Sequence, residues 1–320
     1  MAGVLTALRV FTQRSRLPEP TMDLESFLTA VYCLIDDALA PTLAAQKLRQ
    51  RGPAPILSDS EVLAIAVAGE FLGLATDQAL YRHFRRHHAS LFPRLTQVHR
   101  TTFVRQATNL APAAAALWRH YGAALAARGA LDPAVMIVDS MPVPVCHPAR
   151  NARCRRFRDS AAYGRDSLGK QFFFGFRLHV RLTWPGVITA AALVPANAHD
   201  LTVAPWLLAG QRGWALGDRA YWSPTLRAEL AATGVALEAP RRQSATTFER
   251  WPRWLVNRRR RVETVLAQLA GRYAAKRVWA RDLRHLVARC TRKLLSHTVA
   301  VVLCYEHDLG LLSFDRLLTA

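Results

Sequence analysis

The sequence is poor in lysine, cysteine and acidic residues, and it contains no long apolar run. Lysine occurs four times and cysteine five times in 320 residues, whereas arginine occurs 39 times. Five scattered cysteines do not form the even set typical of a disulfide framework, so we expect a reducing, cytoplasmic setting. No uninterrupted apolar run approaches the roughly 18 residues of a membrane span, so none is predicted.

The shortage of acidic residues leaves a strongly basic chain. Lys and Arg total 43 against 23 Asp and Glu, which gives a net charge of +20 and a sequence pI of about 11.1. This balance indicates a polyanionic partner, either nucleic acid or an acidic membrane. Arginine suits bidentate phosphate contacts, although heavy arginine use also reflects the base composition of a genome.

Changes in residue pattern divide the chain into four parts. Residues 1–21 are predicted to be a loose N-terminal extension, set apart by Pro18 and Pro20. Residues 22–130 show helical periodicity, and residues 131–275 have the mixed pattern of strands and helices. Residues 276–320 are predicted to be a C-terminal helical extension packed on the mixed domain.

The helical region is the predicted DNA-binding part. Ser58 and Glu61 form a capping box that predicts a helix over 62–72. Further along, basic residues alternate with aromatic anchors, which is typical of helices that contact DNA. The alternative is an amphipathic helix whose basic face is only solvated. The candidate phosphate contacts in this region are Arg82, Arg85, Arg86, Arg100 and Arg105.

A buried strand is predicted over 134–138, and Asp139 follows it directly. A carboxylate in such a strand is desolvated, which costs several kcal/mol unless a positive partner compensates. A metal ion is a suitable partner, because it neutralises the carboxylate and makes use of it. The alternative is that Asp139 caps the following turn.

Two further acids occupy comparable positions. Asp218 ends a short apolar run, and Glu263 lies beside the apolar stripe of a helix predicted over 260–269. Together with Asp139 they make an oxygen-ligand set suited to two Mg²⁺ or Mn²⁺ ions, which could clamp the oxygens of a phosphoryl transfer. Glu238 and Glu249 are the alternatives for the third carboxylate, but neither lies in a sustained helix.

The residues preceding Glu263 allow two interpretations. Arg259 and Arg260 either meet DNA phosphate or pair with Glu263 as an ordinary helix-surface ion pair. Small residues, Ala267 and Ala270, follow Glu263 at helical spacing and would let its helix approach a sheet closely.

The order of elements predicts an α/β fold with a mixed five-stranded sheet. After the Asp139 strand and a polar basic loop over 147–170, strands are predicted over 171–184 and 187–194. A helix, the Asp218 strand, a second helix and a short strand over 235–237 follow. This is the element order of a ribonuclease H-like domain, flanked by helices and preceded by the all-helical region.

Two other motifs are approached by the sequence but do not match their signatures. Residues 164–171 approach a P-loop, but Gln171 stands where a Ser or Thr should reach Mg²⁺, and a strand follows. Cys146, His147, Cys154 and His179 do not have the paired spacing of a zinc site.

Six segments together resemble the DDE transposases of bacterial insertion sequences, most closely the group numbered nine-eight-two. They span about residues 23–270, and their order carries more weight than any one of them. The segments are 57–62, 69–73, 98–103, 138–142, 217–221 and 261–265.

The resemblance implies a ribonuclease H-like core, two divalent ions and a catalytic triad of Asp139, Asp218 and Glu263. It implies cleavage of double-stranded DNA at the ends of the element and joining of the freed 3′-hydroxyl to target DNA. A homodimer on DNA and a cytoplasmic, nucleoid-associated bacterial protein would follow. Many members carry Lys or Arg seven residues after the glutamate; this chain has Ala270 there, and Arg272 is the nearest substitute.

Two other functions share these residues. A metal-dependent nuclease without strand transfer would use the same triad, and a non-catalytic DNA-binding protein could keep the same fold. The presence of all three carboxylates favours the enzymes.

Overall fold

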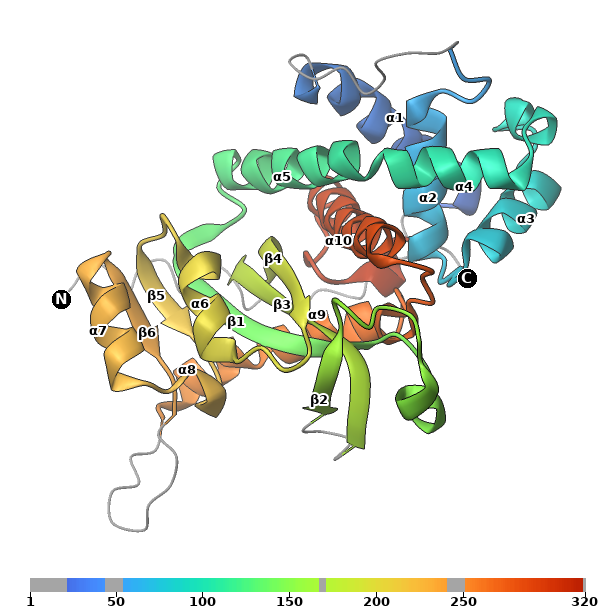
Figure 1. Cartoon of the computed structure of the whole chain (residues 1–320). Coiled ribbons are helices and arrows are strands. Elements are labelled where there is room, and N and C mark those ends of the chain that lie inside the picture. The colour runs from blue at the N-terminus through green and yellow to red at the C-terminus, as the bar shows by residue number, and fades with distance from the viewer. Residues whose placement is uncertain (1–21, 44–53, 167–170, 241–250, 319–320) are drawn as a thin grey trace.

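The computed structural model describes residues 22–43, 54–166, 171–240 and 251–318 (Figure 1). The extension predicted over 1–21 lies outside these ranges, as does Glu249. In the part of the chain that is described, no helix is both long and apolar enough to cross a membrane.

Helices form the layer that precedes the sheet. The predicted capping box is confirmed: the Glu61 amide donates to Ser58 Oγ at 3.0 Å, and the Ser58 amide donates to Glu61 Oε2 at 2.7 Å. These bonds satisfy N–H groups that have no partner within the first helical turn. The α-helices described in this layer are α1 (Leu24–Thr42), α2 (Asp59–Phe71), α3 (Asp77–His87), α4 (Arg100–Asn109) and α5 (Ala111–Ala127).

The sheet is mixed and has six strands in the described residues, in the order β2-β3-β1-β5-β6, with β4 also paired to β3. Strand β3 pairs antiparallel with β1, β2 and β4, whereas β5 pairs parallel with β1 and β6. The strands are β1 (Asp132–Pro144), β2 (Ala162–Asp166), β3 (Gln171–Trp184), β4 (Val187–Pro195), β5 (Gly213–Leu216) and β6 (Val235–Glu238).

The prediction of five strands missed β2, which falls within the predicted loop over 147–170. That loop also contains a short 3-10 helix, η3 (Pro148–Arg153). Strand β2 pairs with residues 171–175 of β3, and β4 pairs with residues 176–183 along the same edge. Because β2 has no apolar alternation, its pairing with β3 rather than its own pattern makes it a strand.

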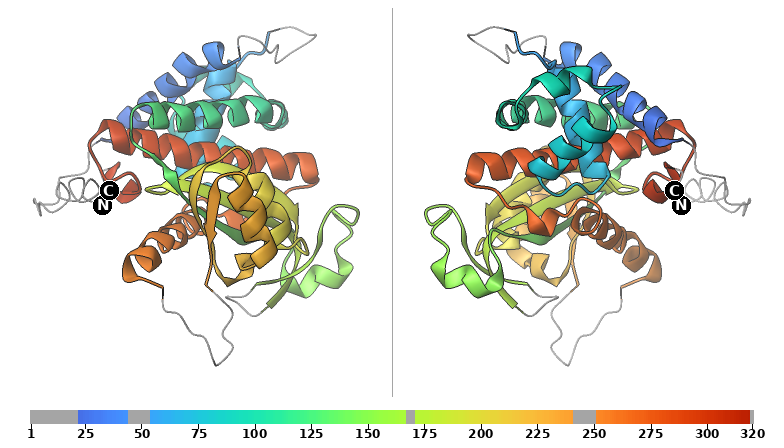
Figure 2. Two further views of the ribbon diagram at one scale, coloured as in Figure 1. Left: turned by 90° about the vertical axis from the view of Figure 1, so that its left-hand side faces the viewer. Right: turned by 90° about the vertical axis from the view of Figure 1, so that its right-hand side faces the viewer.

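Helices cover both faces of the sheet, as Figures 1 and 2 show. Met136 and Val138 of β1 pack in one apolar cluster beneath α6 (Asp200–Leu208) and α7 (Pro224–Ala232). Ile137 belongs to the other cluster, which includes apolar residues of α9 (Arg261–Ala270). Successive strand residues point to opposite faces, so burial on both sides explains the continuous apolar run.

The C-terminal helix α10 (Leu283–Glu306) crosses the molecule and packs largely against α5 and α2 (Figure 1). Buried charges reinforce this packing: Arg292 Nε donates to Glu70 Oε1 at 2.7 Å, and its Nη2 lies 3.0 Å from Asp77 Oδ1. Lys293 Nζ also bonds Glu70. The helix predicted as an extension on the mixed domain thus lies against the N-terminal helices, and the four-part division remains a prediction.

Candidate active site

Asp139 lies in β1, and Asp218 follows the end of β5, the neighbouring parallel strand. Asp139 is within β1, opposite Val180 of β3, and β1 pairs with β5 up to Leu216, two residues before Asp218. Asp218 is therefore beyond the end of its strand rather than in it, where its Oδ1 accepts a hydrogen bond from the Ala220 amide at 2.9 Å. Strand geometry places both carboxylates at the same part of the sheet.

A glycine allows the sharp turn before Asp218. A Cβ on Gly217 would lie 2.7 Å from the Cβ of Tyr221, closer than real Cβ atoms come. The buried Tyr221 packs under this turn. The Gly-Asp sequence therefore has a steric cause: only glycine lets the chain pass this close and present the carboxylate.

Burial and like charge work against ionisation of the two aspartates. Burial raises the pKa of Asp139 to about 7, and the charge of Asp218 adds to the rise, whereas the Ser140 amide, 2.7 Å from Asp139 Oδ1, opposes it. Burial also raises the pKa of Asp218. The pair thus lacks enough positive charge around it.

The nearby positive charge comes from Arg259, at the end of α8 (Arg253–Arg259). The positive charge of its guanidinium offsets part of the rise in the pKa of Asp139 and Asp218. Arg259 Nη2 also lies 3.5 Å from Glu263 Oε1, one turn further along the chain. Arg259 thus interacts with the aspartate pair on one side and with Glu263 on the other.

Glu263 itself is directed to solvent in this arrangement. The predicted helix is confirmed as α9, which buries Val262, Val265 and Leu269. The Glu263 side chain is 60% exposed. Among the described residues no group of three or more His, Cys, Asp or Glu side chains is arranged to hold a metal ion.

A third aspartate near the pair, Asp200, was not predicted as part of the site. It begins α6, and its Oδ1 accepts a hydrogen bond from Ser140 Oγ at 3.0 Å and lies 3.5 Å from Nδ1 of the buried His179. Its charge contributes to the raised pKa of Asp139 and Asp218. In the sequence it reads as part of a helix cap, so its position could not have been found without the packing of α6 on β1.

The predicted DNA contacts of the helical region are exposed. They project from α3 and α4, while the neighbouring aromatic residues Tyr81, Phe84 and Phe103 are buried. Both interpretations of the pattern, DNA contact and solvated face, are compatible with this arrangement, so DNA contact remains a prediction. The exposed arginines are Arg82, Arg85, Arg86, Arg100, Arg105 and, before Glu263, Arg260.

Arg272, the possible substitute for a basic residue at Ala270, has a different environment. Its guanidinium lies 4.7 Å from the centre of the Phe71 ring and pairs with Asp315. Arg272 thus joins α2 to the C-terminal segment that contains Asp315.

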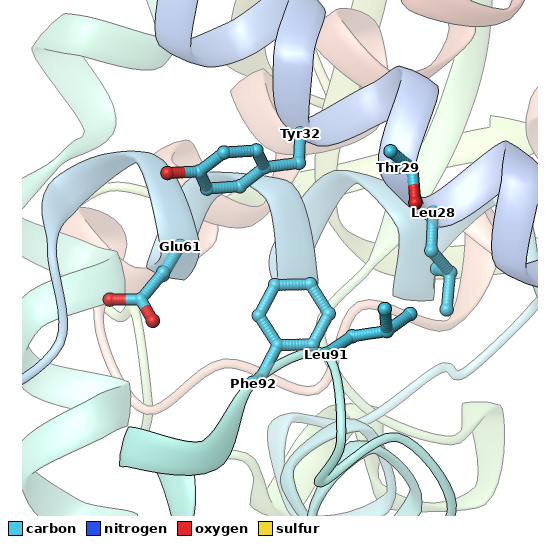
Figure 3. A pocket seen from close by; sticks show the side chains of 6 residues that line it. All are labelled: Leu28, Thr29, Tyr32, Glu61, Leu91 and Phe92. Carbon is cyan, nitrogen blue, oxygen red and sulfur yellow. The ribbon is translucent and has the colours of Figure 1, made fainter.

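One pocket in the described structure lies in the helical layer and is lined by residues of α1, α2 and the segment after α3 (Figure 3). Its polar lining residues are Thr29, Tyr32 and Glu61. Two of them already bond within helices: Glu61 accepts from the Ser58 amide in the capping box, and the Thr29 hydroxyl donates to the Glu25 carbonyl oxygen. The remaining lining residues are Leu28, Leu91 and Phe92.

A comparison with protein families gives one match. Residues 130–276 match the family model of the transposase DDE domain. The match covers the six strands and includes Asp139, Asp218 and Glu263; it extends over somewhat less than half of the chain. It supports a DDE transposase, a class whose domains generally use divalent metal ions. No curated protein and no solved structure matches the chain.

Proposed function

We propose that this protein is a transposase that cleaves DNA at the ends of a bacterial insertion sequence and joins the freed ends to target DNA. The observation that carries the proposal is the pair of Asp139 and Asp218, which are held together with raised pKa values inside a segment that matches the transposase DDE domain. Membership of the group numbered nine-eight-two is part of the proposal, as is a cytoplasmic location on the nucleoid.

The sheet order supports a ribonuclease H-like core. In that fold the first strand lies at the centre, antiparallel to the second and parallel to the fourth. Strand β1 has this position here, between β3 and β5. The additional strand β2 lies at the edge and does not alter the central arrangement.

Of the three proposed metal ligands, Asp139 and Asp218 are already placed to hold a divalent cation. Asp139 and Asp218 supply hard oxygen ligands, and a cation would relieve the burial and like charge that raise their pKa values. When bound, such ions activate water and stabilise the charge of a phosphoryl transfer. Glu263 is proposed as the third ligand. To reach the ion, its side chain would have to leave Arg259 and turn toward Asp139 and Asp218.

The remaining residues position the DNA. The exposed arginines of α3 and α4 would bind phosphates of the duplex, and Arg259 and Arg260 would bind phosphate close to the aspartates. Breaking the pair of Arg259 and Glu263 would then free Arg259 to bind DNA phosphate and free Glu263 to bind the metal ion. Holding two element ends at once favours a homodimer on DNA.

Labelled element ends, Mg²⁺ and a target plasmid test the proposal. The native protein should cleave and join, whereas Asp139→Ala and Asp218→Ala should bind DNA without cleaving it. Cleavage without joining would instead identify a nuclease, and DNA binding without either reaction would identify a non-catalytic protein. Normal joining by either variant would refute the site.

A further inference from the structure

A basic arm extends from the sheet that carries the aspartates. We define the arm as η3, β2, the segment between them and the paired start of β3, residues 171–175. It stands out from the body of the sheet in Figures 1 and 2. Its arginines between 148 and 166 are exposed, and they outnumber its two acids, Asp159 and Asp166. These arginines are Arg150, Arg153, Arg155, Arg156, Arg158 and Arg165.

The hairpin of the arm presents aromatic rings to solvent. Tyr163 pairs with Phe174, and Arg165 pairs with Phe172, so these side chains share one face of the hairpin. Phe172 and Tyr163 are 66% and 52% exposed, respectively. Two exposed aromatic rings beside an arginine on one strand face indicate a partner with flat apolar surfaces and negative charge.

Several contacts hold the arm in a fixed orientation. The Tyr163 ring lies 5.2 Å from the ring of the buried Phe174, and Phe157 packs edge-on against Phe176 at 5.8 Å. A Cβ on Gly164 would come within 2.7 Å of Ala196, so the hairpin lies directly on the chain after β4. The exposed rings are therefore presented by a packed hairpin.

One guanidinium connects the arm to the candidate active site. Arg177 Nη2 donates to the carbonyl oxygen of Arg165 at 2.6 Å, and Nη1 donates to Ser140 Oγ at 3.4 Å. Ser140 follows Asp139 directly in β1. Asp139 is paired with Val180, six to eight residues along β3 from Phe174 and Phe172, so a DNA strand that leaves the aspartates toward the arm would reach the aromatic face after roughly 20–27 Å.

We propose that the arm binds an unpaired DNA strand that extends from the catalytic aspartates, with Tyr163 and Phe172 stacked on bases and the arginines on phosphates. This rests on the proposed function, because it specifies the form of DNA at that site. Paired bases hide their faces within the duplex, so rings on a hairpin can stack only on bases that are unpaired. Separated strands beside the scissile phosphate fit this requirement.

The test compares two labelled DNAs with the full-length protein in EDTA, by fluorescence anisotropy. One is a fully paired duplex, and the other has the same duplex with an unpaired thymine tail. The native protein should prefer the tailed DNA, and the double variant Tyr163→Ala/Phe172→Ala should bind it about tenfold more weakly. Phe172→Trp should keep the preference, since it retains a stacking ring. Trp214→Ala removes an exposed ring from β5 and should behave as native protein.

A second readout follows stacking directly. A 2-aminopurine in the tail should lose fluorescence on binding to native protein and keep it with the double variant. The proposal is wrong if the double variant retains the preference, if it loses affinity for both DNAs equally, or if the rings instead support binding to vesicles of phosphatidylserine and phosphatidylcholine. Native protein that binds neither DNA at low salt would count against the transposase itself.

Discussion

At the scale of single residues, Asp139 destabilises the folded protein when it is ionised, because its carboxylate is buried. Its pKa is about 7 in the folded protein, against about 3.9 in an unfolded chain. Between these values the folded protein binds more protons than the unfolded chain, so stability falls as pH rises from about 4 to about 7. At pH 8 Asp139 is ionised in the folded, metal-free protein, and the loss of stability is complete.

Asp139→Asn should therefore stabilise the metal-free protein at pH 8 while abolishing DNA cleavage. The expected gain is on the order of 2 kcal/mol, and most of it should disappear near pH 4, where Asp139 is protonated in the folded protein and about half protonated in the unfolded chain. Urea unfolding in EDTA at the two pH values measures it. Asp36→Asn changes an exposed acid and should leave stability unchanged. A less stable Asp139→Asn protein at pH 8 would show that the carboxylate is compensated.

Glu263 is the residue whose catalytic role depends on rearrangement. Because its side chain is largely exposed, Glu263→Gln should leave the unfolding free energy within about 0.5 kcal/mol of native. Cleavage should fall by roughly a hundredfold or more if it supplies the third metal ligand. Glu229→Gln, an exposed acid on α7, is the matched control. Full activity of Glu263→Gln would reopen the assignment to Asp200 or Glu238.

At the scale of elements, buried charges join the two ends of the chain. Glu70 of α2 is 2% exposed and bonds both Arg292 and Lys293 of α10. Asp77 of α3 pairs with Arg292 as well. Residues more than 200 positions apart are thus held in one network, and loss of one partner leaves buried cations without compensation.

Glu70→Gln should destabilise the protein by about 3 kcal/mol, because Arg292 and Lys293 would remain buried with less negative charge. Glu306→Gln is the matched control, since it removes a partner of the exposed ion pair with Arg128 and should cost less than about 1 kcal/mol. Urea unfolding measures both. Equal, small effects would mean that the network contributes no more than a surface pair.

At the scale of the whole molecule, the net charge of +20 determines how binding responds to salt. If the basic surface neutralises about six or more phosphates, the affinity for duplex DNA should fall roughly a thousandfold between about 50 and 200 mM salt. Anisotropy titrations over this range measure the slope. A flat response would show that the charge serves another purpose than binding DNA.

Much of the fold follows from local patterns in the sequence. The capping box at Ser58, the apolar run before Asp139 and the helix around Glu263 were predicted because each depends on neighbours within a few residues. Strand β2 was missed because its pairing with β3 is not encoded in its own pattern. His179 and Arg181 are polar residues of β3 that are nevertheless buried, because α6 covers that face of the strand and Arg181 donates to the Leu207 carbonyl oxygen.

The sequence by itself determined the basic charge, the order of the elements and the two aspartates that follow apolar runs, since these are properties of composition and short-range periodicity. Only the tertiary structure decided that Asp200 joins those aspartates, that Arg259 interacts both with them and with Glu263, and that α10 packs on the N-terminal helices. These outcomes depend on contacts between distant segments, where packing and the pairing of buried charges select one arrangement that no local pattern specifies.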